Sequence, residues 1–354
     1  MGTLGLSASS PPRPRAHSVR ARRLSEEIVE LVEAWRPPEE TLGQRKGLVQ
    51  ELRRHFEAEL PGCKLVPFGS AVNGLWLASS DLDLSLEAPG VEGRAQCKQL
   101  LRRVGAAIHR LTGDRPEARL SASMPVLRWV PSRPGQPSCD ISVNNLLAVE
   151  NSQLIGAYVA VDARLRALVL AAKLWARARR INDRSRGTLS SFALSLMLVH
   201  LLQRRGELPS LQDLAVERGD PQRLVLGVDC RYCADVGAAA EAAALLPGAD
   251  GAASEGSLGA AFLAFLRYFG LQYRGGVVAT REPAQGLVAE PPRGGSFLFV
   301  ENPFERGRDV ATVEAGQLVR IREEFRCAYR HLHAGGSLAE LCGAAGGNDH
   351  MGLL

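Results

Sequence analysis

The sequence lacks several features that would restrict what the protein can be. No stretch approaches the roughly 18 consecutive apolar residues that a membrane span requires. The seven cysteines are scattered, their number is odd and no signal peptide is visible, so no disulfide framework is expected. Cys230 and Cys233 form a C-x-x-C without the second pair that a zinc site usually needs. We therefore expect reduced thiols and no membrane association.

Acidic residues are missing before Glu26, whereas residues 1–23 contain five arginines and three prolines. Such a segment cannot form a core, so we expect a disordered basic tail over residues 1–23. The alternative is an organellar transit peptide, which is also rich in arginine and poor in acids, but the prolines disfavour its amphipathic helix. The expected compartment is the cytoplasm, with the mitochondrion as the alternative.

The overall composition is that of an ordinary globular protein. Hydrophobic residues make up 45% and charged residues 23% of the 354 residues, a length that suffices for two domains. The net charge of +5 permits a polyanionic partner but does not establish one.

Local patterns predict an α/β unit followed by a helical region. A first helix is expected to begin at a Ser25 cap and to end at Pro37-Pro38, with a second one around residues 48–56. Strands are predicted at residues 64–68, 81–87, 117–122, 126–130 and 138–143, with a helix at 91–111. Further helices are predicted at residues 164–180, 189–204, 258–269 and 313–333, with strands at 275–281 and 296–300 and a loose connection around a short helix over 235–256. These patterns predict an α+β fold.

Two aspartates alternate with leucines in the strand predicted at residues 81–87. Because side chains alternate along a strand, Leu82 and Leu84 would enter a core, while Asp81 and Asp83 would share the other face, ~7 Å apart. Neighbouring carboxylates repel unless a cation neutralises them, and Mg²⁺ prefers such oxygen ligands. Surface strands often carry such a pair, so its surroundings decide what it means.

The surroundings of this pair support a phosphate and metal site. Gly69 and Ser70 precede a short helical stretch, and glycine lets the backbone approach a phosphate that the serine hydroxyl and nearby amides can hold. A third carboxylate, Asp140, lies on the strand predicted at residues 138–143. If the two strands adjoin, three carboxylates cluster on one face of the sheet.

Three carboxylates around two Mg²⁺ ions form the arrangement that transfers a nucleotidyl group. One ion would lower the pKa of a 3′ hydroxyl, and the other would neutralise the leaving pyrophosphate. Catalysis would then rest on positioning and charge stabilisation. The sequence predicts Asp81, Asp83 and Asp140 as catalytic metal ligands for two Mg²⁺ or Mn²⁺ ions.

The chain resembles the non-canonical poly(A) polymerase and terminal uridylyltransferase family, a branch of the DNA polymerase β-like nucleotidyltransferases, from about residue 40 to 333. Four blocks carry the resemblance in the family's order. The first is GSAVNGLW at residue 69 with SSDLD at residue 79, and the second is CDISVNN at residue 139 with ENS at residue 150. The third is AAKLWAR at residue 171 with IN at residue 181 and GTLSSF at residue 187, and the fourth is VENPFE at residue 300. The resemblance implies a polymerase β-like palm, with a mixed sheet and helices, and a mostly helical central domain, with the active-site cleft between them. The corresponding ranges are 24–147 for the palm with its leading helices, 148–335 for the helical domain and 336–354 for a flexible tail.

The resemblance also implies a nucleotide-binding set. Asn151 matches the asparagine that reads the ribose 2′ hydroxyl, although a helix N-cap is its structural alternative. Lys173 and Arg177, at positions i and i+4 of one helix, match the basic pair that holds the triphosphate. Ser191 and Phe192 match the serine that holds phosphate and the aromatic ring that stacks on the base. The family often has tyrosine at the latter position, and stacking survives that change.

Residues 300–313 resemble the family's nucleotide-recognition loop, with Asn302, Glu305 and Arg308 as candidate base-recognition residues. Uridylyl-specific members often carry a histidine there, whereas this loop has none and is about one residue shorter than many. Base choice between UTP and ATP stays open. The helical block over residues 151–203 looks most like the uridylyl-adding branch, which favours UTP.

The expected activity is template-independent addition of UMP or AMP to an RNA 3′ end by a monomer. The sequence has no RNA-recognition, zinc-finger or KH-like segment, so a basic groove between the domains would hold RNA, with help from an RNA-binding partner protein. One alternative is an inactive relative that binds RNA or a nucleotide, against which the three aspartates argue. Another is a different branch, such as tRNA 3′-end addition, small-molecule adenylylation or oligoadenylate synthesis. Asn151 and the block at residues 187–192 disfavour that branch.

Overall fold

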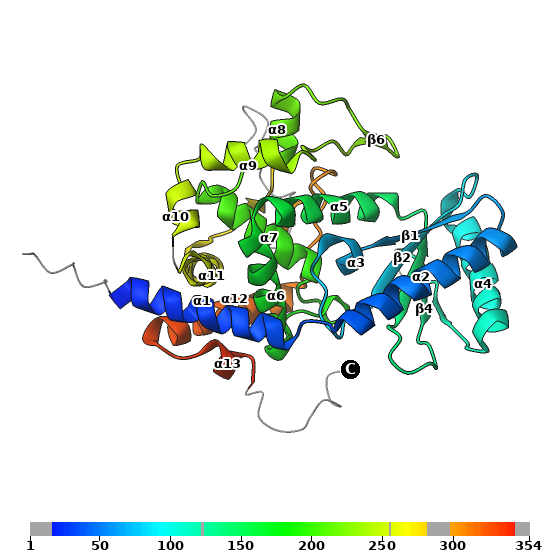
Figure 1. Ribbon diagram of the computed structural model, residues 1–354, viewed down its shortest axis with the longest axis horizontal. Coiled ribbons are helices and arrows are strands. Elements are labelled where there is room, and N and C mark those ends of the chain that lie inside the picture. Colours follow the sequence, from blue (N-terminus) through cyan, green and yellow to red (C-terminus); the bar gives the residue numbers. More distant parts are fainter. Residues whose placement is uncertain (1–15, 122–123, 255, 282–297, 344–354) are drawn as a thin grey trace, which may run out of the picture.

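The computed structural model describes residues 16–121, 124–254, 256–281 and 298–343, arranged as a sheet domain beside a larger helical domain (Figure 1). The sheet has the order β1-β2-β5-β4-β3. Strands β2 and β5 are parallel and the other neighbours are antiparallel, so the sheet is mixed. Its strands are β1 (Lys64–Phe68), β2 (Leu82–Glu87), β3 (Glu117–Arg119), β4 (Val126–Trp129) and β5 (Cys139–Val143).

Helices α2 (Glu39–Glu59) and α4 (Gly93–Thr112) cover one face of this sheet. Leu82 and Leu84 of β2 are buried against them, as the alternation in the sequence predicts. Because side chains alternate along a strand, the aspartates of the same segment lie on the opposite face. The short helix α3 (Ser70–Asn73) follows β1 on the side of the helical domain, where it packs against α5.

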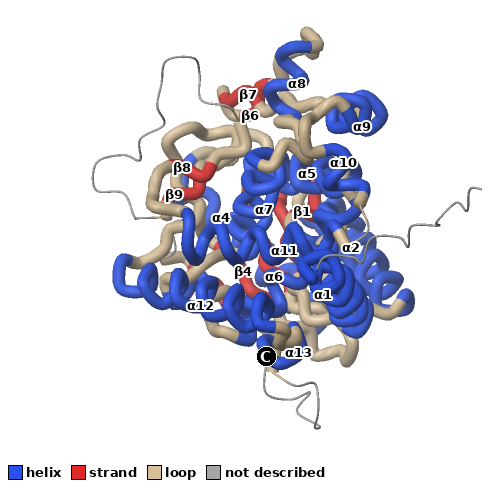
Figure 2. The backbone as a smooth tube through the Cα atoms, turned by 90° about the vertical axis from the view of Figure 1, so that its left-hand side faces the viewer, coloured by secondary structure: helices blue, strands red, loops and turns tan. Residues whose placement is uncertain are grey.

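The helical domain is built around α6 (Ala163–Ala178), most of whose side chains are buried. Trp175 is fully buried, and its ring meets Phe325 edge to face at 4.8 Å between centroids. Figure 2 shows α1 (Ala16–Ala34), α6, α11 (Ser257–Arg267) and α12 (Ala315–Ala334) side by side. The other helices are α5 (Leu146–Val161), α7 (Ser191–Arg204), α8 (Leu211–Glu217), α9 (Val236–Ala244), α10 (Ala249–Ala253), α11 (Ser257–Arg267), α12 (Ala315–Ala334) and α13 (Leu338–Leu341).

Several short elements join these helices. They are a 3-10 turn at Arg184–Arg186, a π-helical turn at Tyr268–Gln272, the hairpin β6 (Leu224–Val225) and β7 (Val228–Asp229), and the parallel pair β8 (Val277–Val278) and β9 (Phe299–Val300). The strands predicted at 275–281 and 296–300 are therefore much shorter than expected, and residues 296–297 lie outside the described residues. The connection predicted at 235–256 contains two helices, α9 and α10.

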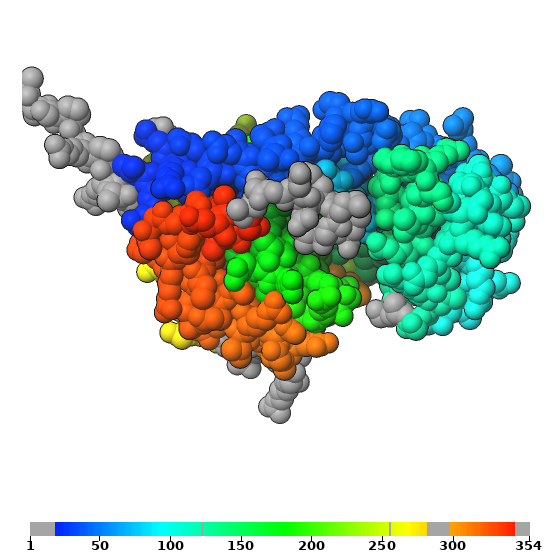
Figure 3. Space-filling view, turned by 90° about the horizontal axis from the view of Figure 1, so that it is seen from below, coloured from blue at the N-terminus to red at the C-terminus, as the bar shows by residue number. Residues whose placement is uncertain are grey.

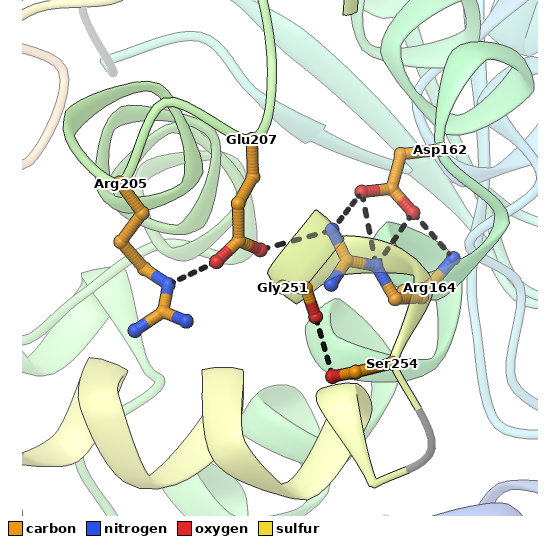
Figure 4. A network of polar contacts seen from close by, with 6 residues as sticks. All are labelled: Asp162, Arg164, Arg205, Glu207, Gly251 and Ser254. Carbon is orange, nitrogen blue, oxygen red and sulfur yellow. Dashed lines mark hydrogen bonds and ion pairs between the residues drawn. The ribbon is translucent and has the colours of Figure 1, made fainter. Parts of the chain in front are cut away.

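A chain of buried charges fixes one corner of the helical domain (Figure 4). Asp162 caps α6 and pairs with Arg164, and Arg164 also pairs with Glu207 at 3.0 Å. Glu207, which follows α7, takes a second partner in Arg205. The α5–α6 corner is thus tied to the end of α7 by groups that would be costly to bury unpaired.

The ends of the described chain differ from the sequence prediction. Helix α1 (Ala16–Ala34) begins well before the predicted Ser25 cap, so the expected disordered tail is wrong for residues 16–23. The hydroxyl of Ser25 instead donates to the carbonyl oxygen of Ala21 within the helix. Helix α13 likewise lies within the tail predicted at 336–354, where Ser337 caps it. Tertiary packing, which the local composition does not reveal, stabilises both segments.

Helix α1 also belongs to a different domain from the one the sequence suggests. Leu24, Ile28 and Val32 are buried in the core of the helical domain, whereas α2 packs on the sheet. Of the two leading helices assigned to the palm, α2 packs on the sheet, whereas α1 packs in the core of the helical domain. The chain starts on the helical domain, crosses to the sheet domain and returns.

None of the helices that the structure describes is long and apolar enough to cross a membrane. All seven cysteines are free, and Cys230 and Cys233 are buried in the core of the helical domain.

Candidate active site

Three aspartates meet where β2 and β5 run side by side. The parallel register pairs Asp83 directly with Asp140, and Asp81 lies just before β2. The sequence expectation that the two strands adjoin is confirmed. The three carboxylates share the sheet face turned away from α2 and α4.

The carboxylates perturb one another because they are close together and shielded from water. Burial, and then the charges of Asp140 and Asp81, raise the pKa of Asp83 to about 7. Burial also raises the pKa of Asp140, an effect that the positive charge of Arg128 opposes. The cluster therefore holds more negative charge than its surroundings neutralise, which favours a bound cation.

Arg128 reaches into this cluster from strand β4 of the sheet. Its Nη1 atom lies 3.6 Å from Oδ2 of Asp81 and 3.6 Å from Oδ1 of Asp140. The sequence reasoning missed it, although a signal was present. Leu127 and Trp129 alternate with Arg128 in β4 and are buried, so strand parity places the arginine on the polar face.

The site fits a divalent metal ion by the chemistry of its donors. All three ligand candidates offer carboxylate oxygens, the donors that Mg²⁺ and Mn²⁺ prefer. Oδ1 of Asp140 is buried and accepts no hydrogen bond. Within the described residues, no three acidic, thiol or imidazole side chains are yet close enough to enclose an ion. Arg128 lies between the carboxylates of Asp81 and Asp140 in this arrangement, so metal binding requires them to converge.

The Gly69 turn lies directly against Asp83. Gly69 has a φ of +65°, and a side chain there would run into the Asp83 carboxylate, so the position accepts only glycine. Its N–H donates to Oγ of Ser152 at 2.8 Å, so this amide is not free to hold a phosphate. The groups at this turn that remain available to an anion are therefore Ser70 and the start of α3. Ser152 is a functional support that the sequence reasoning did not assign.

Arg45 supports the segment that precedes Asp81. It is buried on α2, and its Nη2 atom donates to the carbonyl oxygens of Ala78 at 2.8 Å and Ser80 at 3.0 Å. Its guanidinium also lies 4.6 Å from the centre of the Trp76 ring. No local pattern distinguishes Arg45 from the other arginines of α2, so sequence reasoning could not have found it.

The aspartates open into a cleft of about 690 Å³ between the two domains. Figure 3 views this boundary, where the green part of the helical domain faces the teal part of the sheet domain across a furrow. Every predicted site residue lines the cleft except Asp140, which reaches the cluster through its pairing with Asp83.

Asn151 lies inside α5 rather than at its start. Asn145 occupies the N-cap position, so the alternative of Asn151 as a helix cap is wrong. The side chain is 8% exposed, and its Oδ1 atom is buried without a hydrogen-bond partner. Because an unpaired buried acceptor is costly, this atom is suited to a donor from a ligand such as a ribose hydroxyl.

Lys173 and Arg177 face the cleft from one side of α6, as predicted. Lys173 is 4% exposed, and its Nζ donates to the carbonyl oxygen of Leu75 at 3.0 Å, so it is not a solvated helix charge. Burial, reinforced by the nearby positive charge of Arg177, lowers the pKa of Lys173 to about 7. Arg177 donates to Oγ of Ser79 at 3.1 Å, and burial lowers its pKa as well. Neither side chain is in an ion pair with a carboxylate of the described residues, so the buried amine and the half-buried guanidinium are suited to bind an anion in the cleft.

Ser191 and Phe192 stand at the start of α7. Ser190 caps this helix through the N–H of Ala193, which places the next two side chains in its first turn. The hydroxyl of Ser191 donates to Oδ1 of Asn182 at 3.2 Å. Phe192 is half-buried at the cleft wall and presents an aromatic ring to it.

The loop over residues 300–313 is organised by its own side chains. Oδ1 of Asn302 accepts from the N–H groups of Phe304 and Glu305, and its Nδ2 donates to Glu305. Asn302 therefore shapes the loop, and its amide is occupied rather than free to read a base. Glu305 pairs with Arg308, whose side chain is 61% exposed at the cleft.

This chain is similar to known proteins in sequence and in fold. Residues 24–160 match the central palm domain of mitochondrial-like poly(A) RNA polymerases. Poly(A) RNA polymerase GLD2 of Bos taurus is 30% identical over 88% of this chain and 64% of its own length. Terminal uridylyltransferase cid1 of Schizosaccharomyces pombe is 29% identical over 82% of this chain and 74% of its own. The chain thus spans just under two thirds of the length of GLD2.

Solved structures of the Cid1 poly(U) polymerase resemble the whole described fold. The MgGTP-bound form has a TM-score of 0.76 at 26% identity and covers 90% of this chain and 98% of that chain. The form bound to the UTP analog UMPNPP has a TM-score of 0.74 at 25% identity, covering 91% and 96%.

Proposed function

We propose that this chain, which is similar to the non-canonical poly(A) polymerases and terminal uridylyltransferases, adds single ribonucleotides to RNA 3′ ends without a template. UMP is the first candidate nucleotide and AMP the second. The observation that carries the proposal is the β2–β5 register, which sets Asp83 beside Asp140 in the same cleft as Lys173 and Arg177.

Each group in the cleft has a role in this reaction. Asp81, Asp83 and Asp140 would hold two Mg²⁺ ions, which supply charge stabilisation at the triphosphate and acidify the attacking hydroxyl. Lys173 and Arg177 bind the phosphates of the incoming nucleotide. The burial of Lys173 strengthens its contact, because charges interact more strongly away from water.

The sugar and base of the nucleotide have their own contacts. Asn151 accepts a hydrogen bond from the ribose 2′ hydroxyl through its unpaired Oδ1 atom. Phe192 stacks on the base. A Cid1 structure with the short product ApU supports an RNA acceptor in the same kind of cleft.

Base choice falls to the pair formed by Arg308 and Glu305. Arginine offers only donors and a carboxylate only acceptors, so the pair presents a donor beside an acceptor. Uracil and adenine both carry an acceptor beside a donor on their pairing edges, in opposite order. UMP is favoured by the similarity to the Cid1 poly(U) polymerase over the whole fold, and AMP by the similarity to GLD2.

The decisive experiment is extension of a labelled short RNA with Mg²⁺ and each of the four NTPs separately. A ladder with UTP alone identifies a terminal uridylyltransferase, and a ladder with ATP alone identifies a poly(A) polymerase. Absence of extension with every NTP, in folded protein, would overturn the proposal in favour of an RNA- or nucleotide-binding relative. An aminoglycoside or unprimed ATP used in preference to RNA would overturn it in favour of another branch.

We further propose that the protein acts as a monomer in the cytoplasm and that a partner protein supplies RNA affinity. Among the described residues, the cations that line the cleft are Lys173, Arg177, Arg184 and Arg308, and the first two are assigned to the incoming nucleotide, which supports the need for a partner. Light scattering of the purified chain tests the monomer. Residues 1–15, on which the mitochondrial alternative depends, lie outside the described residues.

A further inference from the structure

The β6–β7 hairpin carries a leucine in an unusual backbone conformation. Leu226 and Gly227 form its two-residue turn, with φ of +52° and +79°. Turns with two positive φ values match the twist of a hairpin, and Asn-Gly is their preferred sequence. Leucine in this left-handed region costs about 1 kcal/mol or more because its Cβ approaches the following carbonyl oxygen.

Packing of the Leu226 side chain does not compensate for this strain. The Leu226 side chain is 67% exposed, so it contributes little to any core. Strained residues that the packing does not require are concentrated at functional sites. The unfavourable conformation and the exposed apolar side chain therefore indicate a contact that the isolated chain does not make.

Leu226 lines the catalytic cleft, although its hairpin lies far along the chain from the sheet domain. Figure 1 shows the hairpin projecting from the helical domain over α5 towards the sheet. Leu224, two residues earlier, is 65% exposed but does not line the cleft. Leu224 and Leu226 thus belong to the same hairpin and are similarly exposed, but only Leu226 lines the cleft.

The hairpin is anchored beside the nucleotide site. Arg223 pairs through Nη2 with Oε1 of Glu150 at 2.8 Å, and Glu150 is buried on α5 directly before Asn151. The N–H of Cys230 donates to the carbonyl oxygen of Arg223 at 2.8 Å, which closes the base of the hairpin. The position of Leu226 is therefore fixed relative to α5, as a substrate contact requires.

We propose that Leu226 packs against the 3′-terminal base of the RNA acceptor and positions it for extension. The inference rests on the proposed function. Groups on α6, α7 and the 300–313 loop already serve the incoming nucleotide, whereas Leu226 enters from the hairpin above α5. An aliphatic side chain makes no hydrogen bonds, so it contacts any base equally well. That property suits an enzyme whose acceptor end changes with each addition.

The test is Leu226→Asn, with Leu224→Asn as the matched control. Leu226→Asn creates the preferred Asn-Gly turn, so its melting temperature should equal or exceed that of the wild type. The KM for RNA should rise roughly tenfold, within the range that base-packing contacts provide. The KM for the nucleotide and kcat at saturating RNA should not change. Leu224→Asn should leave the melting temperature, both KM values and kcat as they are in the wild type.

An RNA whose 3′-terminal nucleotide lacks a base isolates the contact. Removing the base should weaken binding to the wild type, measured by fluorescence anisotropy without NTP, but should have little further effect on Leu226→Asn. Equal losses in both proteins would overturn the proposal. A raised KM for the nucleotide instead would assign Leu226 to the incoming base, and an equal effect of Leu224→Asn would assign the change to the hairpin as a whole. Because binding is measured without NTP, this test stands even if the wild type extends no RNA, an outcome that would overturn the proposed function alone.

Discussion

Arg128 and Asp140 lie directly opposite each other across strands β4 and β5, with Nη1 of the arginine 3.6 Å from Oδ1 of the aspartate. The same guanidinium nitrogen also lies 3.6 Å from Asp81. The arginine therefore supplies positive charge where two carboxylates would otherwise repel each other. A divalent ion entering the cluster has to share these carboxylates with it.

Arg128→Met should make the protein depend on metal for stability. Without the guanidinium, the metal-free carboxylates lose their counter-charge, so the melting temperature in EDTA should fall. Added Mg²⁺ should then raise it more than in the wild type, because the ion replaces the lost charge. Differential scanning fluorimetry across a Mg²⁺ series measures both effects. Arg102→Met, at an exposed position of α4, is the control, and identical Mg²⁺ shifts in both variants would contradict the role given to Arg128.

Asp83→Asn should abolish nucleotide addition while stabilising the metal-free protein. Activity should fall by at least about 10³-fold, because a group that stabilises charge in the transition state is lost. Burial and neighbouring aspartates raise the pKa of Asp83 to about 7 in the folded protein, above the value of about 3.9 expected when unfolded. A carboxylate with a raised pKa lowers stability increasingly as pH rises from the unfolded to the folded value. The variant should therefore melt above the wild type at pH 8 in EDTA, and near-normal turnover would refute the metal assignment.

Mg²⁺ binding should tighten as pH rises from 6 to 8. A proton must leave Asp83 before it can hold the ion, and the pKa of about 7 places this loss within the window. Lys173, whose pKa is lowered to about 7, loses its positive charge over the same range, which acts in the same direction. Calorimetric titration of the protein with MgCl₂ at several pH values measures the trend. The slope should be shallower in Asp83→Asn, and an affinity independent of pH in the wild type would show that neither group titrates here.

Asn151→Ala should narrow the preference for ribonucleotides. The ratio of kcat/KM for UTP to that for dUTP, or for ATP to dATP, should fall roughly tenfold, the effect of one hydrogen bond to a buried group. Efficiency with the deoxynucleotide should change little, because that substrate never made the contact. Ser195→Ala is the control variant, because Ser195 is also buried and lines the cleft, but from α7. If the ratio stays constant in Asn151→Ala, the 2′ hydroxyl is read elsewhere.

The parts of the site that could be predicted are those with a local signature. The alternation of side chains along their strand predicts that Asp81 and Asp83 lie on the same face of the sheet. The spacing of four residues likewise predicts that Lys173 and Arg177 lie on the same side of their helix. The pairing of Asp83 with Asp140 joins strands far apart in sequence, so it followed from family resemblance and strand parity rather than from local pattern.

The features that were missed depend on tertiary contacts. Helix α1 is stabilised by packing on α11, where Gly259 allows the backbones to approach closely, and the arginine-rich composition of residues 16–23 hides this. Arg45 acts through carbonyl groups on a distant loop. Leu226 is notable only for a backbone angle, which sequence patterns do not reveal.

The register between β2 and β5 also limits how relatives of this chain could lose the carboxylate cluster over evolutionary time. Side chains alternate along β5, so deleting one residue within it would turn Asp140 towards α4 and Ile141 towards the cleft. A gap that destroys the metal site would thus also bury a charge and expose core, and the domain would not fold. Inactive descendants of this chain should therefore carry single substitutions at the aspartates, within strands of unchanged length. In related sequences, strands of intact length therefore do not indicate activity. The residues at the positions of Asp81, Asp83 and Asp140 do.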